Sequence, residues 1–405
     1  MRLRRSLAGL ALPLSLLALP LAAPGAAAKS WCAYPLWVHE WGVHVFDGAG
    51  RAQDASALLP DFFHRSVPGS AGASGPSVRD LPPDGGERDL PVVHFYSPRR
   101  DAHIPVGLEV GFTGGPASVW YPQIDLFRTA ADANGVAAAA ARARLLLARA
   151  ARANAQGGPA LPPDPTRQLI WNDLELTTTP PHAPAPTKVP WVEDVRRFDA
   201  LWASTGGESE RFVFYEAQSD EKLPLELRRG NTFGPGRRHY ELHNLGAQPV
   251  HDVFVVHREP GHVYVFFAPQ IPARSSAGFL LEEHEVAAAD LAKATDDQLR
   301  ASLVDAAAPA APSDYRWDMD HCVMQRDPAV PVESAEGYRL YRSEVDAILK
   351  VWGNRFFGRT GTTIVYREDP ATLDAAMPLS VYTDMYNFVV LRRAGLALWE
   401  SVVLP

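Results

Sequence analysis

Short runs of alternating apolar and polar residues fill the first two thirds of the chain. They occur at 37–46, 90–96, 106–112, 117–121, 168–177, 211–215, 238–245, 251–257 and 262–268. A period of two predicts half-buried strands, and the turn residues between the runs favour antiparallel pairing. Gly114-Gly115 predicts a hairpin between two of these strands. The last three runs together predict an antiparallel sandwich module.

The last third of the chain has helical periodicity instead. Apolar residues recur at three- and four-residue intervals across 281–304 and 336–357, and a shorter helix is expected at 193–203. The Ala-rich stretch 130–155 favours either an exposed helix or a low-complexity insertion.

The predicted fold class is therefore α+β and β-dominated. An antiparallel β-sandwich-like core fills 29–282, with loop insertions at 66–90 and 130–190. A C-terminal helix-plus-strand segment, 283–405, is expected to pack on that core.

The N-terminus has the three parts of a cleavable signal peptide. Arg2, Arg4 and Arg5 precede an apolar run at 7–23, and three alanines end at Ala28. The run is too short for a membrane span. We expect cleavage near Ala28, a periplasmic or secreted mature chain, and no transmembrane segment in it.

Composition limits the partners and the cofactors. The chain of 405 residues has a formal net charge of -8 and no cluster of basic residues, which argues against a nucleic-acid partner. The contents of 46% hydrophobic and 21% charged residues are ordinary for a globular protein. No cofactor is expected. The chain has two cysteines, and in an oxidising compartment they predict a Cys32–Cys322 disulfide, with two separate buried thiols as the alternative.

The string Trp37-Val38-His39-Glu40-Trp41-Gly42 after the signal peptide resembles a family of exported bacterial proteins of unknown function that share a Val-His-Glu-Trp-Gly motif there. Three later blocks are similar to that family and follow its order: 90–96 with 120–122, 210–215, and the helix bearing Trp352 followed by 362–366. The chain departs from the family at Val43-His44-Val45 and at Glu216-Ala217. The resemblance implies a shared fold and export, and it implies no particular activity.

The first candidate functional site is His39, Glu40 and Trp41. On a strand, His39 and Glu40 point to opposite faces, so they do not form a direct acid–base pair. A buried Glu40 needs a base, and an arginine of the sandwich or a metal would serve. The structural alternative is an ion pair for Glu40 and a backbone hydrogen bond for His39.

The second candidate is a metal site at His239, Glu241 and His243, which share one strand face, with His251 and His257 on a neighbouring strand. A solvated outer face is the simpler interpretation of this pattern. The acidic tract 314–327 lacks the glycine and the terminal glutamate of an EF-hand. No nucleophile-elbow, zinc-protease, dinucleotide or P-loop motif is present.

Two classes of function remain open. The favoured one is a non-catalytic envelope or secreted protein that binds an envelope polymer or a protein partner. The alternative is a periplasmic hydrolase that uses the histidines, either with or without a bound metal.

Overall fold

The computed structural model describes residues 33–53, 59–65, 86–88, 91–100, 103–124, 167–231, 237–306, 316–318, 323–325, 337–384 and 386–405. The predicted signal peptide, both cysteines, the Ala-rich stretch 130–155 and most of the predicted loop 66–90 lie outside these ranges. The cleavage site and the Cys32–Cys322 disulfide therefore stay predictions. Within the described residues, no helix is long and apolar enough to cross a membrane.

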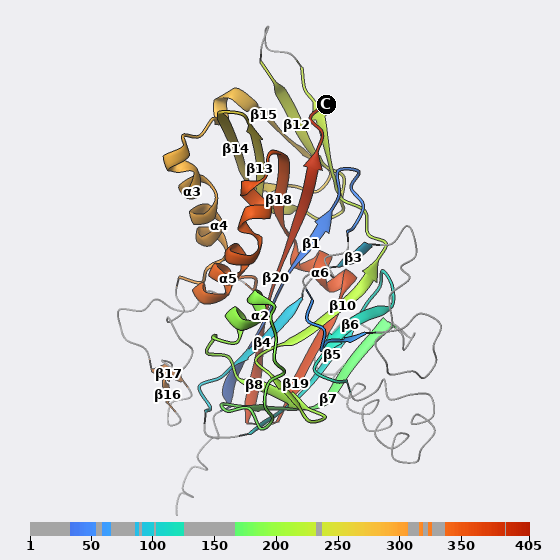
Figure 1. The fold of residues 1–405 in the computed structure, drawn as a ribbon, viewed down its shortest axis with the longest axis vertical. Coiled ribbons are helices and arrows are strands. Elements are labelled where there is room, and N and C mark those ends of the chain that lie inside the picture. Colours follow the sequence, from blue (N-terminus) through green and yellow to red (C-terminus); the bar gives the residue numbers. More distant parts are fainter. Residues whose placement is uncertain are drawn as a thin grey trace, which may run out of the picture.

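Strands dominate the described chain, as the sequence predicts (Figure 1). The largest sheet has the order β14-β13-β18-β20-β1-β4-β10-β6-β2, with β3 paired to β10. Its members are β1 (Tyr34–Phe46), β2 (His64–Arg65), β3 (Gly86–Arg88), β4 (Val92–Tyr96), β6 (Ala117–Tyr121), β10 (Val213–Ser219), β13 (Val250–Glu259), β14 (His262–Ile271), β18 (Gly361–Glu368) and β20 (Asn387–Val402).

Smaller sheets complete the β structure. A five-stranded sheet has the order β19-β5-β7-β8-β9, and a three-stranded sheet has the order β11-β12-β15. Their members are β5 (Ile104–Gly111), β7 (Gln168–Thr177), β8 (Trp202–Thr205), β9 (Glu208–Glu210), β11 (Leu225–Arg229), β12 (His239–Asn244), β15 (Ser276–Leu280) and β19 (Leu379–Thr383). Strands β16 (Arg316–Asp318) and β17 (Val323–Gln325) pair separately. The β-dominated α+β fold class is confirmed.

The predicted hairpin across Gly114-Gly115 is wrong. Strand β5 pairs with β7 and β19, whereas β6 pairs with β10 and β2, so the turn carries the chain from one sheet to the other. Side chains of both strands pack into the same apolar cluster, for example Val110 and Trp120. Apolar residues on facing sheets give the same alternation as a hairpin, so the pattern did not separate the two arrangements.

The helices are shorter than their periodicity predicts. They are α2 (Pro190–Val195), α3 (Leu291–Ala294), α4 (Asp296–Leu303), α5 (Arg342–Gly353) and α6 (Pro370–Ala376), with 3-10 turns η4 (Leu281–His284) and η5 (Ala288–Asp290) and a π turn η7 (Asn354–Gly358). The single helix expected at 281–304 is broken at Glu285, which is extended, and at Thr295, which has φ -121° and ψ -83°.

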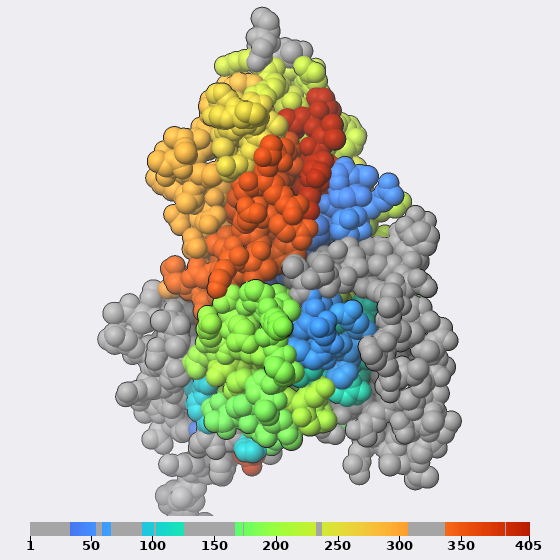
Figure 2. Space-filling model, in the orientation of Figure 1, coloured from blue at the N-terminus to red at the C-terminus, as the bar shows by residue number. Residues whose placement is uncertain are grey.

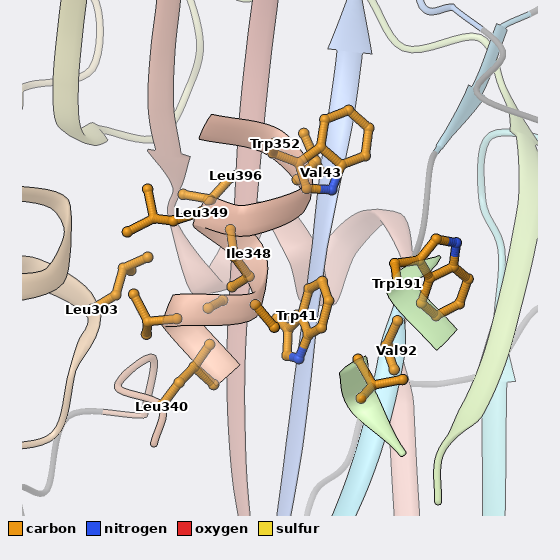
Figure 3. Packing of buried hydrophobic residues seen from close by; sticks show 14 of the residues in the cluster. Trp41, Val43, Val92, Trp191, Leu303, Leu340, Ile348, Leu349, Trp352 and Leu396 are labelled. Carbon is orange, nitrogen blue, oxygen red and sulfur yellow. The ribbon is translucent and has the colours of Figure 1, made fainter. Parts of the chain in front are cut away.

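One face of the largest sheet is covered by helices. Helices α2, α4 and α5 pack there around Trp41 and Val43 of β1, and Figure 3 shows Ile348, Leu349 and Trp352 of α5 over that strand. The apolar cluster on this face is the largest of the three. It joins β1 to α5, which lies some 300 positions later in the sequence.

The opposite face is covered by the two smaller sheets, which divide it between them. Leu36 and Val38 of β1 belong to the cluster under the five-stranded sheet, and Phe46 belongs to the cluster under the three-stranded sheet. Strand β20 follows the same division, with Leu391 on the first cluster and Ala397 and Trp399 in the second. The chain that lies between the two clusters is polar.

The segment 283–405 has a more central place than the sequence indicates. Its strands β18 and β20 lie inside the largest sheet, between β13 and β1, and β20 runs parallel to β1 along the full length of β1. The segment therefore supplies the middle of the sheet, in addition to helices that pack on it (Figure 1).

Candidate functional site

Polar side chains gather where the two small sheets leave the large sheet uncovered. Because side chains alternate along a strand, Glu40 and His44 of β1 share the face of Val38 and Phe46. Register pairs Glu40 with Arg393 and Gly42 with Gly395. Glu368, at the end of β18, reaches the same place. We call Glu40, His44, Glu368 and Arg393 the polar junction.

Glu40 is held by an ion pair inside the junction. Its carboxylate accepts hydrogen bonds from Nε and Nη2 of Arg393 and, at 2.7 Å, from the hydroxyl of Tyr215. Arg393 also donates to Asp374 of α6 and to the carbonyl of Met377. The side chains of Glu40 and Arg393 are only 4% and 5% exposed. An arginine partner for Glu40 is therefore present, but it comes from β20 of the C-terminal segment and not from the sandwich region 29–282 as expected.

His39 points to the opposite face and contacts a carboxylate. Its Nδ1 lies 2.7 Å from Oε2 of Glu344, at the start of α5, and all of the described side chains around this pair are buried. The backbone hydrogen bond expected for His39 is thus replaced by a bond to a glutamate. His94 of β4 lies 3.6 Å from the other oxygen of Glu344, and its ring stacks on Trp41.

Burial and neighbouring charges shift the pKa values of His94 and Glu344. Burial lowers the pKa of His94 to about 4, although Glu344 opposes the shift. Burial alone would raise the pKa of Glu344, but His39 and His94 bring it below its ordinary value. Glu344 is therefore a carboxylate at neutral pH, and it ties the helical layer to β1 and β4.

The sequence-predicted triplet is thus divided between two buried clusters. His39 and Trp41 lie in the helical face, and Glu40 lies in the polar junction, as their alternation predicts. Glu40 makes the ion pair of the structural alternative, whereas His39 contacts the carboxylate of Glu344 in place of the backbone. A ligand role for His39, Glu40 and Trp41 stays a prediction.

The second predicted site lies on an outer surface. His239, Glu241 and His243 alternate with buried residues on β12, and Nε2 of His243 is 3.2 Å from Oε2 of Glu241. Nδ1 of His239 is 3.0 Å from the carbonyl of Asn231. The expectation that His251 and His257 lie on a neighbouring strand is wrong, because β12 pairs with β11 and β15 while β13 belongs to the largest sheet. His251 and His257 contact Asp369 and Thr362 instead.

The structure brings together a different set of metal-binding residue types. His44, Glu221 and Glu368 each place one ligand atom within 4.8 Å of the others. Sequence reasoning missed this set because Glu221 lies in a loop and Glu368 is 324 positions from His44. The available signal was His44 itself, a polar residue at a core-facing position of a strand.

Two hollows lie on either side of this set. A small cavity of about 20 Å³ is lined by Glu40, His44, Glu368 and Gly395 together with apolar side chains of α6, and it has room for a single water molecule or ion. An open cleft of about 670 Å³ is lined by 48–52, 219–223, 225–227, Trp399 and Val403. Glu221 lies on the wall of this cleft. Figure 2 shows the loop after β1, in blue, beside the red C-terminal end of β20.

Comparison with known proteins does not assign a function. No protein-family model and no curated protein matches the chain. The Fcho1 mu-homology domain of Danio rerio with a bound Eps15 peptide is similar over 92% of this chain and 97% of that chain, at 7% identity and a TM-score of 0.27. The yeast delta-COP-I mu-homology domain in complex with a Dsl1 WxWxV peptide is similar over 91% and 95%, at 9% identity and a TM-score of 0.29. TM-scores this low carry no conclusion about fold or function.

The Glu40–Arg393 pair generates the first prediction. Replacing Glu40 by Gln leaves the buried Arg393 guanidinium undercompensated, and we expect the free energy of unfolding to fall by about 3 kcal/mol. The control is Glu226→Gln on β11, where the side chain is 43% exposed and changes of this kind alter stability by less than about 0.5 kcal/mol. Urea denaturation of both variants measures the difference.

The double variant Glu40→Met with Arg393→Met makes the test specific. If the loss in the single variant is an uncompensated charge, the double variant is more stable than Glu40→Gln. A Glu40→Gln protein as stable as the native one would contradict the structural role of the pair.

His94 generates a prediction about pH. Its pKa in the folded protein, about 4, is lower than the unfolded value near 6.5, so the unfolded chain binds the extra proton between those values. Stability is therefore expected to fall as the pH drops from 6.5 toward 4, by about 3 kcal/mol from this group. Glu344 adds a loss only at lower pH, because its unfolded pKa is near 4.5.

His94→Phe should flatten that slope, because phenylalanine fills a similar volume without a titrating group. Urea denaturation at a series of pH values between 7 and 4.5 measures the slope. His262→Gln, a change at a half-exposed histidine, serves as the control. An unchanged slope in His94→Phe would show that His94 does not carry the effect.

Proposed function

We propose that this protein is an exported binding protein that holds an envelope polymer or a protein partner in the open cleft beside the end of β20. The observation that carries the proposal is the composition of that cleft. Charged side chains of both signs, Arg51, Lys222, Asp220 and Glu221, surround a hollow of about 670 Å³. Its size is within the usual range for ligand sites.

The position of the cleft also supports a binding role. Its walls come from four parts of the fold: the loop after β1, the loop between β10 and β11, strand β11 itself, and the C-terminal end of β20. Loops held by a rigid sheet are the usual location of binding residues, because the sheet fixes them while their side chains remain free to vary. Trp399 on the cleft wall is 8% exposed and Val403 is 81% exposed, so the cleft offers apolar contact at Val403 beside its charged side chains.

The hydrolase alternative has one specific observation in its favour. His44, Glu221 and Glu368 lie close to one another, and Glu221 also lines the cleft, so a metal held by the three would share a ligand with the cleft wall. Release of product from ester, amide or phosphate substrates, dependent on Glu221, would support that alternative over a purely binding role.

Export generates its own prediction. We expect the protein purified from the envelope of its native cell to begin near Lys29, because the residues before it form a complete signal peptide. Intact-mass spectrometry measures the start of the chain. A mass that retains the first 28 residues would refute export by cleavage.

The cleft generates the next prediction. Ala49 is exposed on its wall, and Ala49→Trp should fill part of the hollow without disturbing the core. We expect the tagged variant to capture much less of the envelope polymer or protein that the native chain captures from a solubilised envelope fraction. Polysaccharide staining and mass spectrometry of the captured material give the comparison.

Ala292→Trp is the matched control. Ala292 is also exposed, but it lies on α3, away from the cleft (Figure 1). Capture retained in Ala292→Trp and lost in Ala49→Trp supports the cleft. Capture that is equal in both variants, or absent from the native protein, contradicts the proposal.

A further inference from the structure

Three residues from three separate elements converge between the small cavity and the open cleft. His44 comes from β1, Glu368 from the end of β18, and Glu221 from the loop between β10 and β11. Nδ1 of His44 lies 3.4 Å from Oε2 of Glu221 and 4.0 Å from Oε1 of Glu368. None of the three residues belongs to the candidate sites that the sequence suggested.

These separations are close to those of a metal coordination sphere. Zn²⁺ binds imidazole nitrogen and carboxylate oxygen at about 2.0–2.2 Å, so two tetrahedral ligands lie roughly 3.4 Å apart. The distance from His44 to Glu221 equals that value. Oε1 of Glu368 is farther away, at 4.0 Å from Nδ1 of His44, so a rotation of the Glu368 side chain must bring its carboxylate closer to the ion.

Charge and burial favour a cation at this point. The side chains of His44 and Glu368 are 1% and 6% exposed, while that of Glu221 is 28% exposed. Two carboxylates brought this close repel each other, and burial strengthens the repulsion. A divalent ion bound by both, with His44 as the third ligand, offsets it.

The surroundings supply both space and support. The Oε2 atom of Glu368 lies where a side chain on residue 395 would begin, since a Cβ there would be 2.6 Å from it. Glycine at this position therefore lets the carboxylate lie against β20. The small cavity is lined by His44 and Glu368 and the open cleft by Glu221, so an ion could reach the group through the partly exposed Glu221.

We propose that His44, Glu221 and Glu368 bind one divalent transition-metal ion, with Zn²⁺ favoured. An imidazole ligand selects against Ca²⁺ and Mg²⁺, which prefer oxygen alone, and Zn²⁺ binds mixed nitrogen and oxygen sites more tightly than Mn²⁺ does. Three protein ligands with one open position are the arrangement of a zinc ion that can also contact a bound molecule. The proposal does not depend on which partner the cleft binds.

Calorimetric titration of chelator-treated full-length protein with ZnCl₂ tests the site. We expect one equivalent to bind, and Glu221→Gln to weaken the affinity by more than about 10-fold, since even residues behind the ligands contribute 10–100-fold. Glu221 is the residue to change because it is partly exposed, so the variant is expected to fold. A thermal melt of each protein, with and without Zn²⁺, checks folding and should show a shift in the native protein alone.

Glu226→Gln is the control, because Glu226 lines the same cleft but pairs with Arg228 and lies outside the group of three. It should bind Zn²⁺ like the native protein. Binding that survives in Glu221→Gln would place the ion at one of the surface histidines and overturn the proposal. Native protein that binds no equivalent of Zn²⁺ would overturn it as well. Loss of polymer capture in Ala49→Trp with intact Zn²⁺ binding separates this site from the binding role of the cleft.

Discussion

The rest of the structure depends on one constraint: β1 and β20 lie side by side in the middle of a sheet whose two faces are both covered. A charged side chain in the buried middle of either strand cannot reach solvent, so it requires a partner within the protein. Glu40 pairs with Arg393 across the two strands, His39 pairs with Glu344 of α5, and Arg392 pairs with Asp305 after α4. Each pair joins a central strand to a different element. The buried charges therefore help to fix which layers pack on which face.

The second face of the sheet shows how the polar junction arises. Two separate sheets share the cover of this face, and each provides its own apolar cluster. Between the clusters, β1 and β20 present Glu40, His44, Arg393 and Gly395 instead of apolar residues. At the boundary between two covering sheets, fewer apolar side chains are available to fill the core than under the centre of each sheet. This boundary is thus the place where a continuous core gives way to a cavity, a cleft and charged groups.

Periodicity predicted the strands well because the alternation of apolar and polar residues in a strand depends only on which of its two faces is buried. The strand at Gln168–Thr177 has the expected bounds, and β12 has the predicted alternation of buried and partly exposed residues. The opposite directions of His39 and Glu40, and an arginine partner for Glu40, were also predictable from alternation and from the cost of buried charge. The identity of that arginine was not, because residues 40 and 393 become neighbours only through a parallel pairing of distant strands. Pattern likewise did not distinguish two strands of one hairpin from two strands on facing sheets.

The same strand also explains why Glu40 and His44 have different prospects as functional groups. They lie on one face, four residues apart, with Gly42 between them. Glu40 already has its charge balanced by Arg393 and a hydrogen bond from Tyr215, and the adjacent cavity of about 20 Å³ leaves no room for an organic ligand. His44 is next to Glu221, whose side chain reaches the surface of the open cleft. A ligand must both fit into a site and reach it from solvent. Glu40 lies in a closed ion pair, whereas His44, four residues later on β1, contacts a residue of the open cleft. The carboxylate of Glu40 is thus enclosed by its partners, whereas His44 contacts a carboxylate that reaches the open cleft.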